Sequence, residues 1–224
     1  DDFNIIQDNK GANIYTLKDG LPKPAANVSP GDIKYRDLNN DGVIDKMDQT
    51  YKNGLNSANP EIVYGFGLNL EYKGFFAGIF FQGVGKATTN LLSSVANIMP
   101  FYSGVDSSSA RIEALDRWTA SDPYNQNVMF PRMHATKYDH NNQKSTWWYR
   151  NASFLRLKNV EFGYNFDKQM LQKLRMSNIK LFVQGTNLAV WDNIKLWDPE
   201  LGNSTSGSTY PICGTWTIGL EVTF

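Results

Sequence analysis

Residues 37–48, DLNNDGVIDKMD, carry oxygen-bearing side chains at the spacing of a calcium-binding loop. In the twelve-residue EF-hand loop the ligands occupy positions 1, 3, 5, 7, 9 and 12, position 7 contributes a backbone carbonyl, and position 6 is glycine. Gly42 falls at position 6, where the chain must turn sharply around the ion. We therefore expect a structural Ca²⁺ held by Asp37, Asn39, Asp41, the carbonyl of Val43, Asp45 and Asp48.

Two departures from the EF-hand pattern argue against a calcium sensor. Asp48 at position 12 is shorter than the usual glutamate, which favours a monodentate contact. The next residues, QTYKNGLNSANP, are interrupted by Gly and Pro, so they do not form the exiting helix that a regulatory EF-hand needs. An Asp- and Asn-rich turn that binds no ion remains the alternative.

Composition excludes several classes of function. The 224 residues carry 22 Lys and Arg against 22 Asp and Glu, so no nucleic-acid-binding surface is expected. The single cysteine, Cys213, allows neither an internal disulfide nor a cysteine-based zinc site, and we expect it to be a half-buried apolar residue. The two histidines, His134 and His140, have no serine or cysteine partner at a catalytic spacing. We therefore expect that the chain is not an enzyme.

Alternation of apolar and polar residues predicts five long strands. In residues 62–72, large apolar side chains occupy one face and Val, Gly, Asn and Glu the other. Aromatic residues at both ends of an apolar face suit a lipid-facing barrel strand, although a soluble sandwich shows the same alternation. The expected strands cover residues 61–72, 74–83, 154–166, 178–190 and 214–224.

Connections between these strands alternate between short and long. A tight turn at Lys73-Gly74 is expected to join the first two strands as a hairpin, but the register of the second strand stays open because Phe76 and Phe80 make both of its faces apolar. Before Asn159 the third strand is apolar on both faces, at Phe154, Leu155 and Leu157, so a β-bulge or an end packed against a loop is expected there. Residues 84–152 and 191–213 are expected to be loops, and short helices are expected at residues 109–118, with Ser109 as N-cap, and at residues 167–174.

The last strand has the strictest alternation. Thr, Gly and Glu separate its large apolar residues, and the last residue is Phe224. This pattern resembles the signal by which bacterial outer-membrane barrels are recognised for insertion, whereas a soluble edge strand of this kind would be open to aggregation. The residues of the expected insertion signal are Trp216, Ile218, Leu220, Val222 and Phe224.

Several segments, in order, resemble one protein family. GDIKYRDLNNDGVIDKMD is followed by NPEIVYGFGLNLEYKGFFAGIFFQG, then by RW, FPR, SFLRLKNVEFGYNF, LFVQGTNLAVW and DPE, and finally by the terminal Phe224. From about residue 31 to residue 224 the chain resembles the C-terminal part of the SusC/RagA-type TonB-dependent outer-membrane transporters of Bacteroidetes.

The resemblance implies an all-β fold and a transport function. Family members form antiparallel transmembrane β-barrels of about 22 strands with long extracellular loops and an N-terminal plug. They import oligosaccharides or peptides with a SusD-like surface lipoprotein and draw energy from the TonB system. The resemblance therefore implies an outer-membrane location, with the rest of the barrel, the plug and membrane lipid as further partners.

Barrel topology gives each connection a side of the membrane. Strands are antiparallel, with short periplasmic turns and longer extracellular loops. With Phe224 at the periplasmic end, residues 84–152 and 191–213 are extracellular loops, and residues 1–60 form an extracellular region that carries the calcium-type loop. Residues 61–224 then supply the last five strands, fewer than the roughly eight that close a barrel.

Two further interpretations stay open. The tryptophans outside the last strand could contact a sugar, anchor at the membrane interface or pack within loops. A soluble, β-rich, calcium-binding carbohydrate-binding module is the alternative to the transporter. The tryptophans in question are Trp118, Trp147, Trp148, Trp191 and Trp197.

Overall fold

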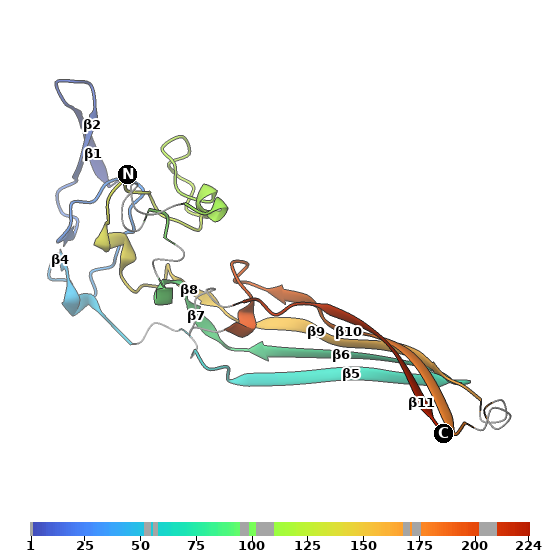
Figure 1. Cartoon of the computed structure of the whole chain (residues 1–224). Coiled ribbons are helices and arrows are strands. Elements are labelled where there is room, and N and C mark those ends of the chain that lie inside the picture. Colours follow the sequence, from blue (N-terminus) through green and yellow to red (C-terminus); the bar gives the residue numbers. More distant parts are fainter. Residues whose placement is uncertain are drawn as a thin grey trace. The chain divides into compact units, whose positions relative to one another are not determined.

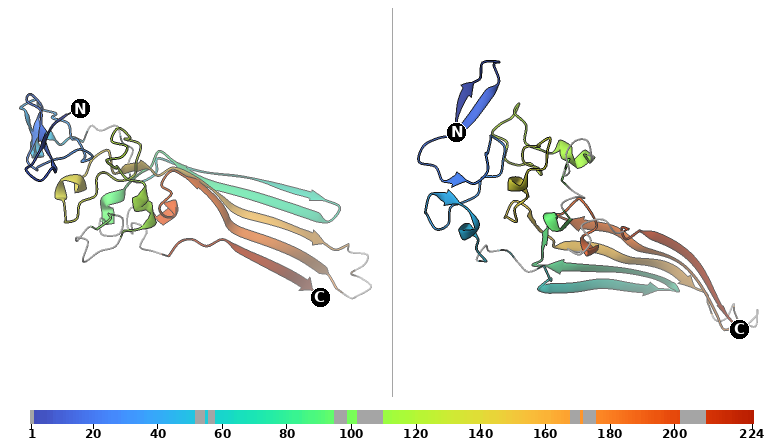
Figure 2. Two further views of the ribbon diagram at one scale, coloured as in Figure 1. Left: turned by 90° about the horizontal axis from the view of Figure 1, so that it is seen from above. Right: turned by 60° about the vertical axis from the view of Figure 1, so that its left-hand side comes forward.

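The computed structural model describes residues 2–51, 55, 58–94, 99–101, 110–167, 171, 176–201 and 210–224. It divides into two compact units, which Figures 1 and 2 show in several views. The first consists of Asp1–Gly54 with Ser94–Trp148, and the second of Leu55–Ser93 with Tyr149–Phe224. The fold is all-β, as the sequence predicts, with strands joined by loops and short 3₁₀ turns.

The second unit contains one antiparallel sheet of five long strands in the order β11-β10-β9-β6-β5. The strands lie side by side and curve together along their length, as Figures 1 and 2 show. Their number and order follow from the predicted hairpins, and their bounds are close to the expected ones. They are β5 (Ile62–Tyr72), β6 (Phe75–Gly85), β9 (Phe154–Asn165), β10 (Asn178–Asp192) and β11 (Thr215–Thr223).

The turn between β5 and β6 is the tight turn that the sequence predicts. Lys73 and Gly74 both have positive φ, 49° and 85°. Two successive positive φ values define the type I′ turn, whose twist matches that of the flanking strands. The hairpin therefore pairs Tyr72 with Phe75 and continues without interruption to Ile62 opposite Gly85.

This register fixes the side of the sheet on which each residue lies. Because side chains alternate, residues in cross-strand register share a face. One face is apolar in successive rows, and the other carries polar side chains, glycines and a few phenylalanines. Three apolar rows are Tyr72–Phe75–Tyr164–Leu181–Leu220, Leu70–Ala77–Phe162–Val183–Ile218 and Leu68–Ile79–Val160–Gly185–Trp216.

Glycines explain why phenylalanines occur on the polar face, the point that the sequence left open. Phe76 is opposite Gly163 of β9, and its ring lies directly over the space that a Cβ of Gly163 would fill. Phe182 lies over Gly219 in the same way, and Phe80 over Gly65 and Gly67. Each ring is thus flat against a neighbouring backbone, where only glycine leaves room for it.

The irregularity expected before Asn159 is a β-bulge. The register with β6 shifts between Phe80 and Phe81, which face Asn159 and Leu157, so Lys158 is the extra residue of a β-bulge. The pairing with β10 shifts at the same level, between Thr186 and Ala189. The bulge separates the first residues of β9, which include Arg156, from the regular part of the strand that follows.

The long connection between β6 and β9 begins and ends with a short β-ladder that the sequence does not predict. β7 (Thr88–Asn90) pairs with β8 (Tyr149–Asn151). The helix expected at residues 109–118 is wrong in type and extent, because only a 3₁₀ turn, η3 (Ile112–Leu115), forms there. Its N-cap residue, Arg111, makes no side-chain capping hydrogen bond, and Ser109 is outside the described residues.

Two further expectations have different outcomes: one lies mostly outside the described residues and one is wrong. Most of the helix expected at residues 167–174 is outside the described residues. Cys213 is exposed rather than half-buried, and its thiol faces the carbonyl of Pro211 at 3.7 Å. Among the described residues no helix is long and apolar enough to cross a membrane.

The first unit is small and loop-rich. Its core includes Ile33, Ala114, Phe130 and Trp148, all buried. The other elements are short strand pairs and turns: β1 (Phe3–Gln7) with β2 (Asn13–Leu17), β3 (Lys23–Pro24) with β4 (Val43–Ile44), and the 3₁₀ turns η1 (Lys46–Asp48), η3 and η4 (Asp139–Asn142).

Replacing Gly163 by alanine tests the packing of rings over glycines. The new Cβ would lie 2.3 Å from Cζ of Phe76 and 2.5 Å from the carbonyl oxygen of Leu181, and this oxygen cannot move without the strand. We expect Gly163→Ala to destabilise the sheet by about 1–3 kcal/mol, as overpacking does. The measurement is the unfolding temperature, at which the band of the folded, compact protein disappears from a gel loaded with samples heated in steps.

Gly85→Ala is the matched control, because its nearest neighbour would be Cβ of Ile62 at an ordinary 3.6 Å. It should change stability by less than about 0.5 kcal/mol. Equal effects of the two substitutions would contradict the packing argument.

Candidate functional site

The calcium-type loop is organised by hydrogen bonds from its own backbone. Asp37 accepts from the backbone N–H of Asn40 at 2.6 Å and from that of Gly42 at 2.9 Å. Asp41 accepts from the N–H of Val43 at 2.9 Å. Gly42, with φ of 83°, makes the sharp turn predicted for position 6. The side chains at positions 1 and 5 therefore fix the path of the first half of the loop.

The second half is closed by a reciprocal cap. Asp45 accepts from the N–H of Met47 at 2.7 Å, and Asp48 accepts from the N–H of Asp45 at 2.8 Å, so the two residues form a capping box around η1. Asp48 also accepts from the N–H of Leu38 at 2.7 Å, which ties the end of the loop to its start. These backbone donors, that of Asp45 first, lower the pKa of Asp48.

A short ladder holds the loop within the first unit. β4 starts at Val43 and pairs in parallel with Lys23–Pro24 of β3. The N–H of Lys23 donates to the carbonyl of Gly42 at 3.0 Å. Val43, expected to supply a carbonyl ligand, is thus placed where the loop leaves its turn.

The loop residues are close in sequence, but their carboxylates are engaged with the backbone and with Asn39. Asn39 donates from Nδ2 to Asp41 at 2.8 Å and accepts from the N–H of Asp41 at 3.1 Å. Among the described residues, no three His, Cys, Asp or Glu side chains are grouped as they would be around a metal ion. Oxygen ligands of this kind suit Ca²⁺ chemically.

The apolar face of the sheet is the largest surface feature of the second unit. All eleven residues of β5 are exposed, and so are most apolar residues of β11. Soluble monomers rarely expose a continuous apolar surface that covers five strands.

Aromatic residues are most frequent toward both ends of this face, and the two rows between them are mainly aliphatic, with Phe162 and Trp216 as the exceptions. Near the β5–β6 turn, Phe75 packs on Tyr164 with ring centroids 4.6 Å apart. Toward the other end, Phe81 stacks on Phe66 at 5.1 Å and contacts Trp191 at 6.5 Å. Two aromatic bands around an aliphatic centre match the two interfaces and the hydrocarbon core of a membrane.

The opposite face is polar and holds an ion pair among aromatic rings. Lys180 pairs with Glu161 at 3.1 Å, and its ammonium lies 4.5 Å from the ring centroid of Phe76 and 5.0 Å from that of Phe182. The rings that cover the glycines thus also flank a cation. Such a surface suits a water-filled interior and does not suit lipid.

The first unit has a buried polar centre that sequence reasoning missed. The carboxylate of Asp32 accepts from Nδ2 of Asn141 at 2.9 Å and from the N–H of Ser29 at 2.8 Å, and it lies 2.6 Å from Nε2 of His134. Asn141 also accepts from the N–H of Ile33 at 3.0 Å. His134 and Asn141 are about a hundred residues away from Asp32 in the sequence, so sequence spacing gave no signal for this cluster.

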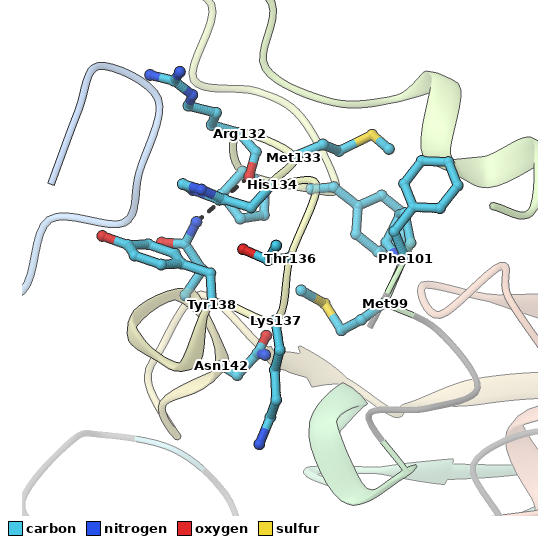
Figure 3. Close-up of a pocket in the computed structure, with 13 residues that line it drawn as sticks. Met99, Phe101, Arg132, Met133, His134, Thr136, Lys137, Tyr138 and Asn142 are labelled. Carbon is cyan, nitrogen blue, oxygen red and sulfur yellow. Dashed lines mark hydrogen bonds between the residues drawn. The ribbon is translucent and has the colours of Figure 1, made fainter. Parts of the chain in front are cut away.

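A small pocket lies beside this cluster. In Figure 3 the side chains of Met99, Phe101 and Met133 gather on one side, and His134 and Tyr138 lie on the other. The rings of His134 and Tyr138 stack at 3.9 Å, and burial raises the pKa of Tyr138 to about 12. The cavity of about 30 Å³ is the size of one or a few waters, too small for a sugar or a peptide side chain.

The tryptophans left open by the sequence have different roles. Trp148 is fully buried and donates from its indole to the carbonyl of Asn141 at 2.8 Å, so it is a core residue. Trp147 donates to Met129, and Trp118 donates to Pro123 while its ring lies over Gly31. Trp191 and Trp216 are exposed on the apolar face of the sheet.

Comparison with known proteins finds relatives over most of the chain. It is 30% identical over 206 residues to TonB-dependent receptor P26 of Formosa agariphila, a match that covers 87% of this chain and 20% of that receptor. It is 27% identical over 219 residues to TonB-dependent receptor P3 of the same bacterium, covering 92% of this chain and 20% of the receptor. The chain therefore spans about a fifth of the length of these relatives. No family model matches.

Solved structures share the fold. The RagAB peptide importer in its closed-closed state superimposes with a TM-score of 0.60 at 19% identity, covering 98% of this chain and 20% of that one. The RagAB peptide transporter gives a TM-score of 0.58 at 21% identity, covering 75% and 18%. The relatives are named as receptors and none as an enzyme, in agreement with the expectation from the sequence. Over most of its length the chain therefore corresponds to part of a TonB-dependent receptor, and it shares the fold of the matching part of RagAB.

Proposed function

We propose that this chain supplies five adjacent strands of the outer-membrane barrel of a TonB-dependent nutrient transporter. The observation that carries the proposal is the two-faced sheet. Its exposed apolar face has aromatic residues toward both ends, and its other face is polar. Eleven residues at about 3.3 Å each make β5 long enough to cross a membrane at a tilt.

We also propose that the whole transporter imports oligosaccharides or peptides together with a SusD-like lipoprotein and the TonB system. Two observations support this proposal: the relatives are named TonB-dependent receptors, and the structural neighbour RagAB is a peptide importer. The rest of the barrel and the plug would lie in the part of the transporter that corresponds to the regions of the relatives outside this match.

Charge substitution of neighbouring residues tests the membrane assignment. Ile218 is 77% exposed in the middle of the apolar face, whereas Thr217 points to the polar face. In the full-length protein, Ile218→Lys should lower folded material in the outer membrane, because a lysine facing the bilayer centre costs about 2–4 kcal/mol. Immunoblotting of detergent-extracted outer membranes measures the effect.

Thr217→Lys is the matched control, since it adds the same charge one residue away on the wet face. It should assemble like the wild type. A soluble carbohydrate-binding module predicts the reverse behaviour, with Ile218→Lys harmless and the protein recovered without detergent, and that result would exclude the transporter.

Growth of a deletion strain identifies the cargo class. A strain that lacks the full-length gene should lose growth on one group of a panel of oligosaccharides and peptides and keep growth on their monomers. Complementation should restore it, and the tagged protein should co-purify with a surface lipoprotein. Normal growth on every oligosaccharide and peptide tested would contradict an import role.

We further propose that residues 37–48 bind Ca²⁺ through Asp37, Asn39, Asp41, the Val43 carbonyl, Asp45 and Asp48. Support comes from the ligand spacing and from the turn at Gly42, which already has the backbone angle that the loop needs. A site outside the cell can work at an affinity of about 0.1–1 mM. The bound ion would stiffen a long connection.

A crystal structure of the full-length protein grown with calcium tests this site. It should show a density peak about 2.3–2.6 Å from the oxygens of Asp37, Asn39 and Asp41. Asp41→Ala should remove the peak, because position 5 loses its ligand. Asp8→Ala is a matched control, since Asp8 makes a similar turn with the N–H groups of Lys10 and Ala12 outside the loop. An empty wild-type loop in such crystals would exclude the proposal.

A further inference from the structure

The segment that begins with the last residue of β10, residues 192–201, is attached to the polar face of the sheet by a buried cation. Arg156, on β9, is 2% exposed. Its Nη2 lies 2.5 Å from Oδ1 of Asp198, and its Nε lies 2.6 Å from Oε1 of Glu200. Both carboxylates come from this segment, which we call the strap. They are more than forty residues away from Arg156 in the sequence.

The strap is shaped so that both carboxylates face Arg156. Asp198 accepts from the N–H of Glu200 at 3.0 Å and leads into the 3₁₀ turn η5 (Pro199–Leu201). At the other end, Asp192 accepts from the N–H groups of Ile194 and Lys195, both at 2.8 Å. Local turns therefore fix both ends of the strap, independently of its contact with Arg156.

The environment of Arg156 makes the contact hard to break. Asp198 is 8% exposed and Glu200 21%, and Lys158 adds a second cation 3.4 Å from Glu200. A charge that loses its partners inside a folded structure is far more costly than an exposed one. If the strap moved away, Arg156 would lose both of its carboxylate partners. The ion pair thus penalises release of the strap.

We propose that Arg156 is a lock that holds the strap permanently against the polar face, so that the strap is a fixed wall and not a movable flap. The strap, together with Val190 and Pro211, lines a hollow of about 330 Å³, whose shape then depends on the lock. If the polar face is the barrel interior, as the proposed function has it, the locked strap permanently narrows the passage through the barrel. Trp197 then lies beside this passage.

Chemical labelling of a buried position of the strap tests the lock. Ile194 is 1% exposed, so an Ile194→Cys thiol reacts with a maleimide only when the strap opens. The experiment uses the full-length protein with Cys213→Ser, which removes the one cysteine of this chain. Arg156→Gln should speed labelling by at least about tenfold, because a neutral side chain cannot hold two carboxylates. Arg156→Lys should give a smaller increase.

Two controls separate the lock from general loosening. Lys180→Gln removes the other ion pair of the polar face, Lys180–Glu161, without contact to the strap, and should leave the rate unchanged. An Ala87→Cys thiol, at a 2% exposed position outside the strap, should stay slow in the Arg156→Gln protein. Unchanged labelling of Ile194→Cys, or equal acceleration by Lys180→Gln or at Ala87→Cys, would overturn the proposal.

A milder variant decides the outcome if Arg156→Gln fails to assemble. Asp198→Asn keeps the shape of the strap and leaves Glu200 beside Arg156, so labelling should rise several-fold, and no rise would overturn the lock. The readout is independent of transport and of cell location. A failed membrane assignment with fast labelling would therefore still leave the lock supported.

Discussion

The structure depends on the strict alternation of side chains across five antiparallel strands. A shift of one residue in any strand would move its entire apolar set to the other face. Two features prevent such a shift: the type I′ turn at Lys73-Gly74, and the rings that fit over glycines on the polar face. Phe76 fits Gly163 and no neighbouring position, because the residues beside Gly163 in β9 carry side chains. Register, packing and polarity therefore specify the same pairing.

Polar interactions organise what the sheet carries. On the polar face two sets of charged groups are paired, Lys180 with Glu161 and Arg156 with Asp198 and Glu200. In the first unit the side chains of His134 and Asn141 meet the buried carboxylate of Asp32. A loop-rich unit with a small apolar core needs such satisfied polar groups to define one conformation.

Sequence reasoning succeeded where the signal is local and periodic. The strands, the hairpin turn and the two faces could be predicted because alternation and Lys73-Gly74 are visible within a few residues. It failed where distant residues decide. Phe76 makes both faces of its strand apolar until Gly163, far away in the sequence, is placed opposite it.

The error at residues 109–118 also comes from packing that the sequence does not show. An apolar pattern suggested a helix at residues 109–118, but Ile112 and Leu115 remain exposed, so no packing contact stabilises more than one turn. The ion pair of Arg156 joins residues that no pattern connects. For the calcium-type loop, the spacing predicted the turn at Gly42. Binding of an ion depends in addition on carboxylates that already accept hydrogen bonds from the backbone.

The two edges of the sheet show why this part of the protein depends on its surroundings. In the described chain β5 and β11 each pair with one neighbour, so each presents a row of unpaired backbone donors and acceptors along its outer side. In water such edges, beside an exposed apolar face, promote aggregation, and in lipid they are not tolerated, because no water satisfies them. Further strands on both sides remove both problems at once, and the chain spans only about a fifth of its relatives. The same sheet is therefore unfavourable alone and stable within a closed wall.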